Sequence, residues 1–193
     1  MLDINHEGSY DMEKRISATT TLLGLIGSPV KHSKSPAIHN AGFQKLGLDY
    51  VYLAFDIKKE QVEEFIRTAK LLNMQGFNVT MPCKAEVAKR VDELSPAAEV
   101  IGATNTVVNE NGRLIGYNTD GTGFIRNLQE HGVEIKGKTI TLMGGGGAGA
   151  AIYAQAVLDG AEKIFVFNRK GDNFIKLENM AQKLKTFVQD CKI

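Results

Sequence analysis

The sequence predicts an α/β protein made of two successive units. Short apolar segments alternate with amphipathic segments, which is typical of a parallel sheet with crossover helices. This pattern restarts near residue 121, and the glycine-rich run GGGGAG follows the first strand of the second unit. Glycine accounts for 20 of the 193 residues. That is more than the usual share of about 7%, and it indicates tight turns and close backbone contacts.

The first unit spans residues 21–120 and follows a polar segment, residues 1–20, that we expect to be a tail. Ser35 and Pro36 predict the start of a helix, with the serine as N-cap and the proline at the first helical position. Gly47 is the expected glycine after its C-terminus. From apolar runs and helical spacing we predict strands at 21–28, 50–57 and 76–80, and helices around 62–69 and 84–91.

A β-hairpin is predicted over residues 105–120, because Asn111-Gly112 between two apolar runs is the preferred dipeptide of a type I′ turn. The second unit spans residues 121–193 and contains a β-α-β-α pattern. Such a pattern leaves one sheet edge and one face of its last helix uncovered, so we expect this unit to be incomplete. Its predicted elements are a helix from about 119 to 131, a buried strand at 139–144, a small-residue helix ending near 160, a strand at 163–168, and a final amphipathic helix.

Charge and cysteine content exclude several classes of protein. Lys and Arg number 23 and Asp and Glu 22, so the chain has no general field that would attract nucleic acid or an anionic membrane. No apolar run is long enough to span a membrane, and residues 1–20 contain no secretory signal. Cys83 and Cys191 lie far apart, and the four histidines lack metal-ligand spacing. We therefore expect a cytoplasmic protein without a metal site.

Gly144, Gly146 and Gly149 have the spacing GxGxxG between a predicted strand and a predicted helix. The first glycine allows a tight turn, the second lets backbone amides approach a pyrophosphate, and the third lets helix and strand pack closely. The N-terminus of the helix attracts the anion. Turn chemistry alone could give this pattern in so glycine-rich a chain, but its position favours a Rossmann dinucleotide site that includes Gly147 and Ala148.

The segment after the second Rossmann strand carries opposite signals about the cofactor. Asn168 occupies the position where an acid is usual, and Arg169 and Lys170 follow it. The two basic residues could pair with a 2′-phosphate, which favours NADP. Asp172 could instead accept a hydrogen bond from the ribose 2′-hydroxyl, which favours NAD. The segment could also be a solvated turn.

Four polar segments lie at predicted strand ends and helix starts. Each has an ordinary structural explanation by itself, because serine caps helices, lone lysines are usually solvated, and Asn and Asp form turns. The segments contain Ser33, Ser35, His39 and Asn40; then Asn78, Thr80 and Lys84; then Asn105 and Thr106; and finally Asn118, Thr119, Asp120 and Gly121.

Taken together, these segments resemble the shikimate dehydrogenase family in order and spacing. The similar stretches are GSPVKHSKSPAIHN, GFNVTMPCK, IGATNTVV with NGRLIGYNTDG, and GGGGAGAA. The resemblance covers roughly residues 20–190. It implies an N-terminal α/β substrate domain followed by an incomplete Rossmann nucleotide-binding domain, with the active site in the cleft between them.

The resemblance also implies roles for individual residues. Lys84 would be the acid/base group with Asp120 beside it, and Ser33 and Ser35 would hold the carboxylate of shikimate or 3-dehydroshikimate. The ring hydroxyls would meet Asn78, Thr80, Asn105, Thr119 and Asp120. The cofactor would meet Gly144, Gly146, Gly147, Ala148 and Gly149 at its pyrophosphate, and Asn168, Arg169, Lys170 and Asp172 near its adenosine ribose.

The implied activity is the reversible, NAD(P)-linked reduction of 3-dehydroshikimate to shikimate, on the route to chorismate and the aromatic amino acids. NADP-dependent members usually carry Asn-Arg-Thr after the second strand, whereas Lys170 replaces the threonine here. This resembles the quinate/shikimate branch, so we expect use of both cofactors with a slight preference for NAD.

Two alternatives stay open: a quinate dehydrogenase, and a truncated substrate-binding remnant without catalysis. We also allow for a homodimer.

Overall fold

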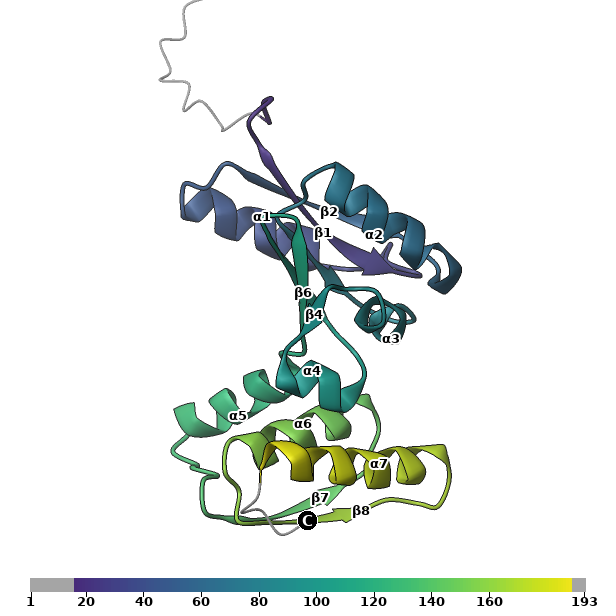
Figure 1. The fold of residues 1–193 in the computed structure, drawn as a ribbon. Coiled ribbons are helices and arrows are strands. Elements are labelled where there is room, and N and C mark those ends of the chain that lie inside the picture. Colours follow the sequence, from purple (N-terminus) through teal and green to yellow (C-terminus); the bar gives the residue numbers. More distant parts are fainter. Residues whose placement is uncertain (1–15, 189–193) are drawn as a thin grey trace, which may run out of the picture.

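The structure, a computed structural model, describes residues 16–188 of the chain (Figure 1). Most of the predicted tail and Cys191 therefore lie outside the described residues. The end of the predicted tail is held in place, since the hydroxyls of Thr19 and Thr20 donate hydrogen bonds to the Asp49 carboxylate at 2.9 and 2.8 Å.

The described chain folds as a mixed α/β structure, and the predicted fold class is confirmed. Six strands form one sheet in the order β2-β1-β3-β5-β6-β4, and β7 pairs with β8 in a separate parallel sheet. In chain order the elements are β1 (Thr21–Gly27), α1 (Ser35–Lys45), β2 (Tyr50–Asp56), a short 3₁₀ helix (Lys59–Gln61), α2 (Val62–Leu71), β3 (Gly76–Val79), α3 (Lys84–Ala88), β4 (Glu93–Leu94), α4 (Pro96–Ile101), β5 (Thr106–Glu110), β6 (Arg113–Tyr117), α5 (Asp120–Glu130), β7 (Thr139–Met143), α6 (Gly147–Leu158), β8 (Lys163–Phe167) and α7 (Asp172–Phe187).

The first sheet is covered on both faces around β1, where successive side chains point to opposite faces. Ile26 of β1 packs with Val62 and Phe65 of α2, whereas its neighbour Leu25 packs on the other side with Tyr52 and Phe43 of α1. This arrangement explains why the strand forms a continuous apolar run in the sequence.

The register of the sheet brings the ends of several strands to one edge. Strands β1 and β3 are parallel, and β5 runs antiparallel to β3 with Asn78 opposite Thr106. Thr106 in turn lies opposite Tyr117 at the end of β6. The loops after β1, β3 and β6 and the segment before β5 therefore all meet at this edge, which we call the polar edge.

The backbone confirms the predicted hairpin turn and contradicts the predicted cap of α1. The hairpin is confirmed, because Asn111 and Gly112 have φ values of 55° and 90°, as a type I′ turn requires. The expected N-cap of α1 is wrong: Ser35 is the first residue of the helix, and no side chain caps it. The Ser33 hydroxyl, two residues earlier, accepts a hydrogen bond from the Ser35 amide at 3.2 Å and so replaces the cap.

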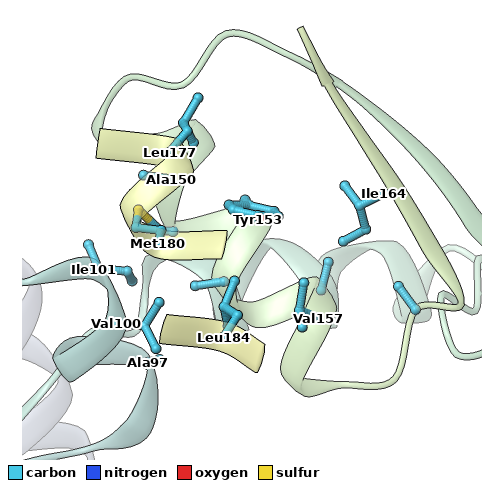
Figure 2. Packing of buried hydrophobic residues seen from close by; sticks show 14 of the residues in the cluster. Ala97, Val100, Ile101, Ala150, Tyr153, Val157, Ile164, Leu177, Met180 and Leu184 are labelled. Atoms are coloured by element: carbon cyan, nitrogen blue, oxygen red, sulfur yellow. The ribbon is translucent and has the colours of Figure 1, made fainter. Parts of the chain in front are cut away.

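The second core is formed mainly by α6 and α7 and includes a helix from much earlier in the chain. Figure 2 shows Leu177, Met180 and Leu184 of α7 beside Tyr153 and Val157 of α6. Helix α4 adds its apolar side to the same cluster through Ala97, Val100 and Ile101. Thus α4, which precedes residue 121, packs with the later part of the chain.

Strand β7 of the second sheet is less buried than expected, and its partner β8 is likewise exposed on one face. Ile164 is buried and Ile140, Leu142 and Val166 pack against the second core, whereas Met143 and Phe167 of the opposite face are 83% and 60% exposed. The prediction of a buried strand at 139–144 is therefore wrong for the face that carries Met143, because within residues 16–188 the second core covers only one side of the sheet.

Candidate active site

Lys84 and Asp120 form an ion pair at the polar edge. The Lys84 Nζ atom lies 2.9 Å from Asp120 Oδ2, and the two side chains are 32% and 43% exposed. Lys84 begins α3 after the turn that follows β3, and Asp120 begins α5 directly after β6. A lysine that is held in place and still reaches solvent is suited to exchanging a proton with a bound ligand.

Asn105 holds the carboxylate of this pair from the other side. Its Nδ2 donates to Asp120 Oδ1 at 2.7 Å and to Thr119 Oγ1 at 3.0 Å. Its Oδ1 accepts from the Thr119 amide at 3.0 Å. Both ends of the Asn105 side chain therefore fix the start of α5, and with it the direction of the Asp120 carboxylate.

Asn78 joins the network through Thr106. The Asn78 Nδ2 atom donates to Thr106 Oγ1 at 3.1 Å, and Thr106 Oγ1 donates to Asn105 Oδ1 at 3.0 Å. Tyr52 donates from its hydroxyl to Asn78 Oδ1 at 2.7 Å, and burial raises the pKa of Tyr52 to about 12. Sequence reasoning missed Tyr52, which it treated only as part of an aromatic strand.

Ser33 and Ser35 lie in and after the loop that follows β1. The Ser33 hydroxyl donates to Ser35 Oγ at 3.2 Å, and both side chains are half-buried. This loop is tied to the loop after β3 by a backbone hydrogen bond of 3.0 Å from Ser28 N to the Met81 carbonyl. The two serines therefore belong to the polar edge, although the structure shows no hydrogen bond from them to Lys84 or Asn78 within the described residues.

Thr80 holds the end of β3 against β1. Its amide donates to the Ile26 carbonyl at 2.8 Å, and its methyl group lies where a Cβ on Gly27 would be. The backbone of Thr80 thus keeps the two strand ends together at the polar edge.

The glycine-rich loop has the geometry that the GxGxxG spacing predicts. Gly144 has φ = 96°, a conformation that L side chains rarely adopt, and a Cβ on Gly149 would collide with the Gly144 carbonyl oxygen. At Gly146 and Gly147 a Cβ would meet nothing within 4 Å, so the backbone at the start of α6 is open to an approaching group. These residues fit a dinucleotide pyrophosphate at the N-terminus of α6.

Sequence reasoning missed Gly145, where a Cβ would collide with the Leu177 side chain of α7. The Gly145 amide donates to Asn168 Oδ1 at 3.0 Å, so Asn168 ties the loop to the end of β8. Arg169, Lys170 and Asp172 follow as exposed residues, with Asp172 at the first position of α7.

Helix α5 connects the polar edge with the glycine-rich loop. Gly121, the residue after Asp120, lies so close to α6 that a Cβ there would collide with the Ala151 carbonyl oxygen. Ala151 is only four residues beyond Gly147, at the first turns of α6. This tight contact between α5 and α6 therefore fixes the start of α5, where Asp120 lies, relative to the first turns of α6, where the loop ends.

Metal sites and membrane-spanning helices are both absent from the part of the chain that the structure describes. Residues 16–188 contain no group of three His, Cys, Asp or Glu side chains able to hold a metal ion. Among the described helices, none combines the length and apolar character needed to cross a membrane.

The fold and the site together define an α/β architecture with a Rossmann-like part, in which the contact of Gly121 with Ala151 joins the polar edge to the unit that carries the glycine-rich loop. Residues 25–107 match the family model described as the shikimate dehydrogenase substrate binding domain. The chain is therefore similar to the shikimate dehydrogenase family, and the matched residues are those of its substrate binding domain.

Individual proteins show the same similarity over most of the chain. A curated shikimate dehydrogenase (NADP(+)) of Listeria monocytogenes is 48% identical over 179 residues, which cover 93% of this chain and 61% of the relative. A crystal structure of the Listeria monocytogenes shikimate 5-dehydrogenase in complex with shikimate and NAD superimposes with a TM-score of 0.87 at 48% identity, covering 92% of this chain and 61% of that one.

A further similar crystal structure is that of an enzyme named for another reaction, the reduction of 5-ketofructose. The ligand-free 5-ketofructose reductase of a Gluconobacter strain gives a TM-score of 0.81 at 31% identity, covering 91% of this chain and 62% of that one. The chain thus spans about three fifths of the length of the relatives it matches.

Proposed function

We propose that this protein catalyses the reversible, NAD(P)-linked interconversion of 3-dehydroshikimate and shikimate in the biosynthesis of chorismate and the aromatic amino acids. The observation that carries the proposal is the Lys84–Asp120 ion pair, whose Asp120 directly precedes Gly121, the residue of α5 that packs against Ala151 of α6. The curated relatives named for this activity support it.

In this proposal the dinucleotide supplies the hydride that adds to the ring carbonyl. Lys84 donates a proton to the carbonyl oxygen as it becomes a hydroxyl, and takes the proton back in the reverse direction. Asp120 keeps the Lys84 ammonium in place and accepts a hydrogen bond from a substrate hydroxyl. Asn105 and Thr119 hold Asp120 in that direction.

The substrate is held at the polar edge. The hydroxyls of Ser33 and Ser35 donate to the substrate carboxylate, and the side chains of Asn78, Thr80 and Asn105 meet the ring hydroxyls. The proposal assigns residues 21–120 to this substrate domain, except that α4 packs in the second core, and residues 121–193 to the nucleotide-binding domain. It places the protein in the cytoplasm. A homodimer stays a prediction.

The cofactor pyrophosphate would be held by the backbone from Gly144 to Gly149, including Gly146, Gly147 and Ala148, at the N-terminus of α6. Arg169, Lys170 and Asp172 would lie near the adenosine ribose, and Asn168 would support the loop from behind. The slight preference for NAD suggested by the sequence is not supported by the relatives, whose names specify NADP(+). One relative's structure contains NAD. We therefore propose that the loop accepts both cofactors.

Two other activities follow from specific observations. Lys170 in place of the usual threonine favours a quinate dehydrogenase. The match of residues 25–107 to a substrate binding domain allows a chain that binds substrate without turnover. The same fold also occurs in a reductase named for a different ketone, 5-ketofructose.

One set of measurements separates these activities. The protein is incubated with shikimate or quinate and with NADP⁺ or NAD⁺, and NAD(P)H formation is followed by absorbance while shikimate binding is measured by calorimetry. A Lys84→Ala variant purified in parallel controls for contaminating dehydrogenases. We expect a higher kcat/KM with shikimate than with quinate. A higher value with quinate would assign the second activity, and binding without turnover would assign the third.

A further inference from the structure

Tyr52 is a buried tyrosine whose side chain ends at the candidate active site. It lies on β2 and is 2% exposed, and its ring stacks on His39 with the centroids 4.3 Å apart. The Asn40 side chain of α1 bonds both backbone groups of Tyr52, accepting from its amide at 2.8 Å and donating to its carbonyl at 2.9 Å. Tyr52 is therefore held on both its backbone and its ring face.

The hydroxyl of Tyr52 determines what Asn78 can offer to a ligand. Asn78 Oδ1 accepts from Tyr52 at 2.7 Å, while Nδ2 donates to Thr106 Oγ1 at 3.1 Å and to the Asn105 carbonyl at 3.4 Å. An amide has two hydrogens and two lone pairs on its oxygen. Both hydrogens of Nδ2 are thus in use. The second lone pair of Oδ1 is free to accept a hydrogen bond from a ligand.

We propose that Tyr52 is a positioning residue that fixes the Asn78 amide, so that Oδ1 accepts a hydrogen bond from a substrate hydroxyl. This inference rests on the proposed function for the identity of the ligand. Because Tyr52 is almost completely buried, it acts through Asn78 and not by touching the ligand.

The opposite orientation of the amide would disrupt the network. A rotated Asn78 would point Oδ1 at the Asn105 carbonyl oxygen, so that two acceptors would face each other. It would also draw the Thr106 hydroxyl away from Asn105 Oδ1, to which it donates at 3.0 Å. Asn105 in turn bonds Asp120 at 2.7 Å, so the orientation that Tyr52 fixes extends as far as the ion pair.

The test removes only the hydroxyl. Shikimate affinity of the whole protein is measured by calorimetry for the wild type, Tyr52→Phe and the matched control Tyr50→Phe, which lies on the same strand and packs its ring against Phe43. We expect the dissociation constant to rise about tenfold in Tyr52→Phe, equivalent to about 1.4 kcal/mol. It should stay within about twofold in Tyr50→Phe. KM should rise in parallel, with kcat changed much less.

A double-mutant cycle identifies the path of the effect. In an Asn78→Ala background, Tyr52→Phe should cause no further loss of affinity, because the atom it positions is absent. Additive losses would overturn the proposal. So would a lower melting temperature of Tyr52→Phe with unchanged affinity, since that result assigns Tyr52 to stability alone.

Failure of the proposed function gives a different result. If the wild type binds no shikimate, the proposed function fails, and the positioning role is then judged from the Asn78 side-chain amide resonances. A shift of these resonances in Tyr52→Phe but not in Tyr50→Phe supports the role, and unchanged resonances overturn it.

Discussion

Lys84 and Asp120, 36 residues apart in the chain, place Nζ and Oδ2 2.9 Å from each other. Each is the first residue of a helix, α3 and α5 respectively. Their contact therefore links the end of β3 with the end of β6, at the point where the chain leaves the first sheet for the second core. The residues of the proposed proton transfer therefore also join elements of the two parts of the molecule.

Lys84→Ala should lower kcat by a factor of about 10²–10⁴ and change KM far less, because a placed proton donor acts in the transition state. Steady-state kinetics in the direction of shikimate oxidation measures this. Lys89→Ala is the control, since Lys89 is an exposed lysine on the same segment that pairs with Glu86. If KM rises while kcat is kept, Lys84 anchors the substrate and does not transfer the proton.

Ser33→Ala and Ser35→Ala should each weaken shikimate binding by about 1.5–3 kcal/mol, the value of a hydrogen bond to a charged group. The structure separates their effects on stability. Ser33→Ala should also lower the melting temperature, because Ser33 accepts the Ser35 amide, whereas Ser35→Ala should not.

The control for the two serines is Ser95→Ala, because Ser95 caps α4 by accepting the Ala98 amide. It should reduce stability by about 1 kcal/mol and leave KM unchanged. Unchanged KM values for both Ser33→Ala and Ser35→Ala would remove these residues from the substrate site.

Glu86 should make stability depend on pH in the acid range. Hydrogen bonds from Lys89 and Arg90 lower the pKa of its carboxyl from 4.5 to about 2. The native state thus favours the ionised form, so this stabilisation is complete above the unfolded-state value of 4.5 and is lost as the pH falls from there toward 2.

Urea unfolding of the wild type and of Glu86→Gln at several pH values measures this contribution. The difference between the two proteins should be largest near neutral pH and should shrink below about pH 4.5. A difference that does not depend on pH would contradict the assignment. Glu64→Gln, which changes an exposed residue of α2, controls for general charge effects.

The segment after β8 should set the choice of cofactor. Arg169→Ala should lower the use of NADP, because it removes a partner of the 2′-phosphate, and Asp172→Ala should raise it by removing a repelling carboxylate. The ratio of kcat/KM for NADP⁺ and NAD⁺ measures both effects. Lys185→Ala, in the last turn of α7, should leave the ratio unchanged.

A wild-type preference for NADP above about a hundredfold, or about 2.7 kcal/mol, would show that the basic residues dominate over Asp172. Equal use of the two cofactors together with no effect of either substitution would instead assign the segment to a solvated turn.

Much of the fold was predictable because its signals are local. Gly47 after α1, with φ = 68°, the Asn111-Gly112 turn and Gly144 of the loop, with φ = 96°, each adopt a backbone conformation that few residues other than glycine tolerate. Helix α2 was predictable because its apolar residues repeat at helical spacing over its whole length. Such features depend little on the rest of the chain.

The features that were missed depend on distant partners. Helix α4 has six residues, too few for a clear periodic pattern, and its apolar residues are buried by α6 and α7 from the other end of the chain. Tyr52 lies in an aromatic strand segment, and the partner of its hydroxyl, Asn78, is 26 residues away. Gly145 is restricted by Leu177, which belongs to α7. None of these contacts leaves a pattern within its own segment.

The path of the chain through α4 limits how the molecule can be divided. The chain leaves the first sheet after β4 to place α4 in the second core, returns for β5 and β6, and leaves again at α5 (Figure 1). Three covalent crossings therefore connect the two parts. Proteolysis at any one of them leaves two peptide connections intact, and a fragment starting at residue 121 lacks Ala97, Val100 and Ile101 from its core. Neither part corresponds to one continuous stretch of sequence, so no single cut yields two complete folding units.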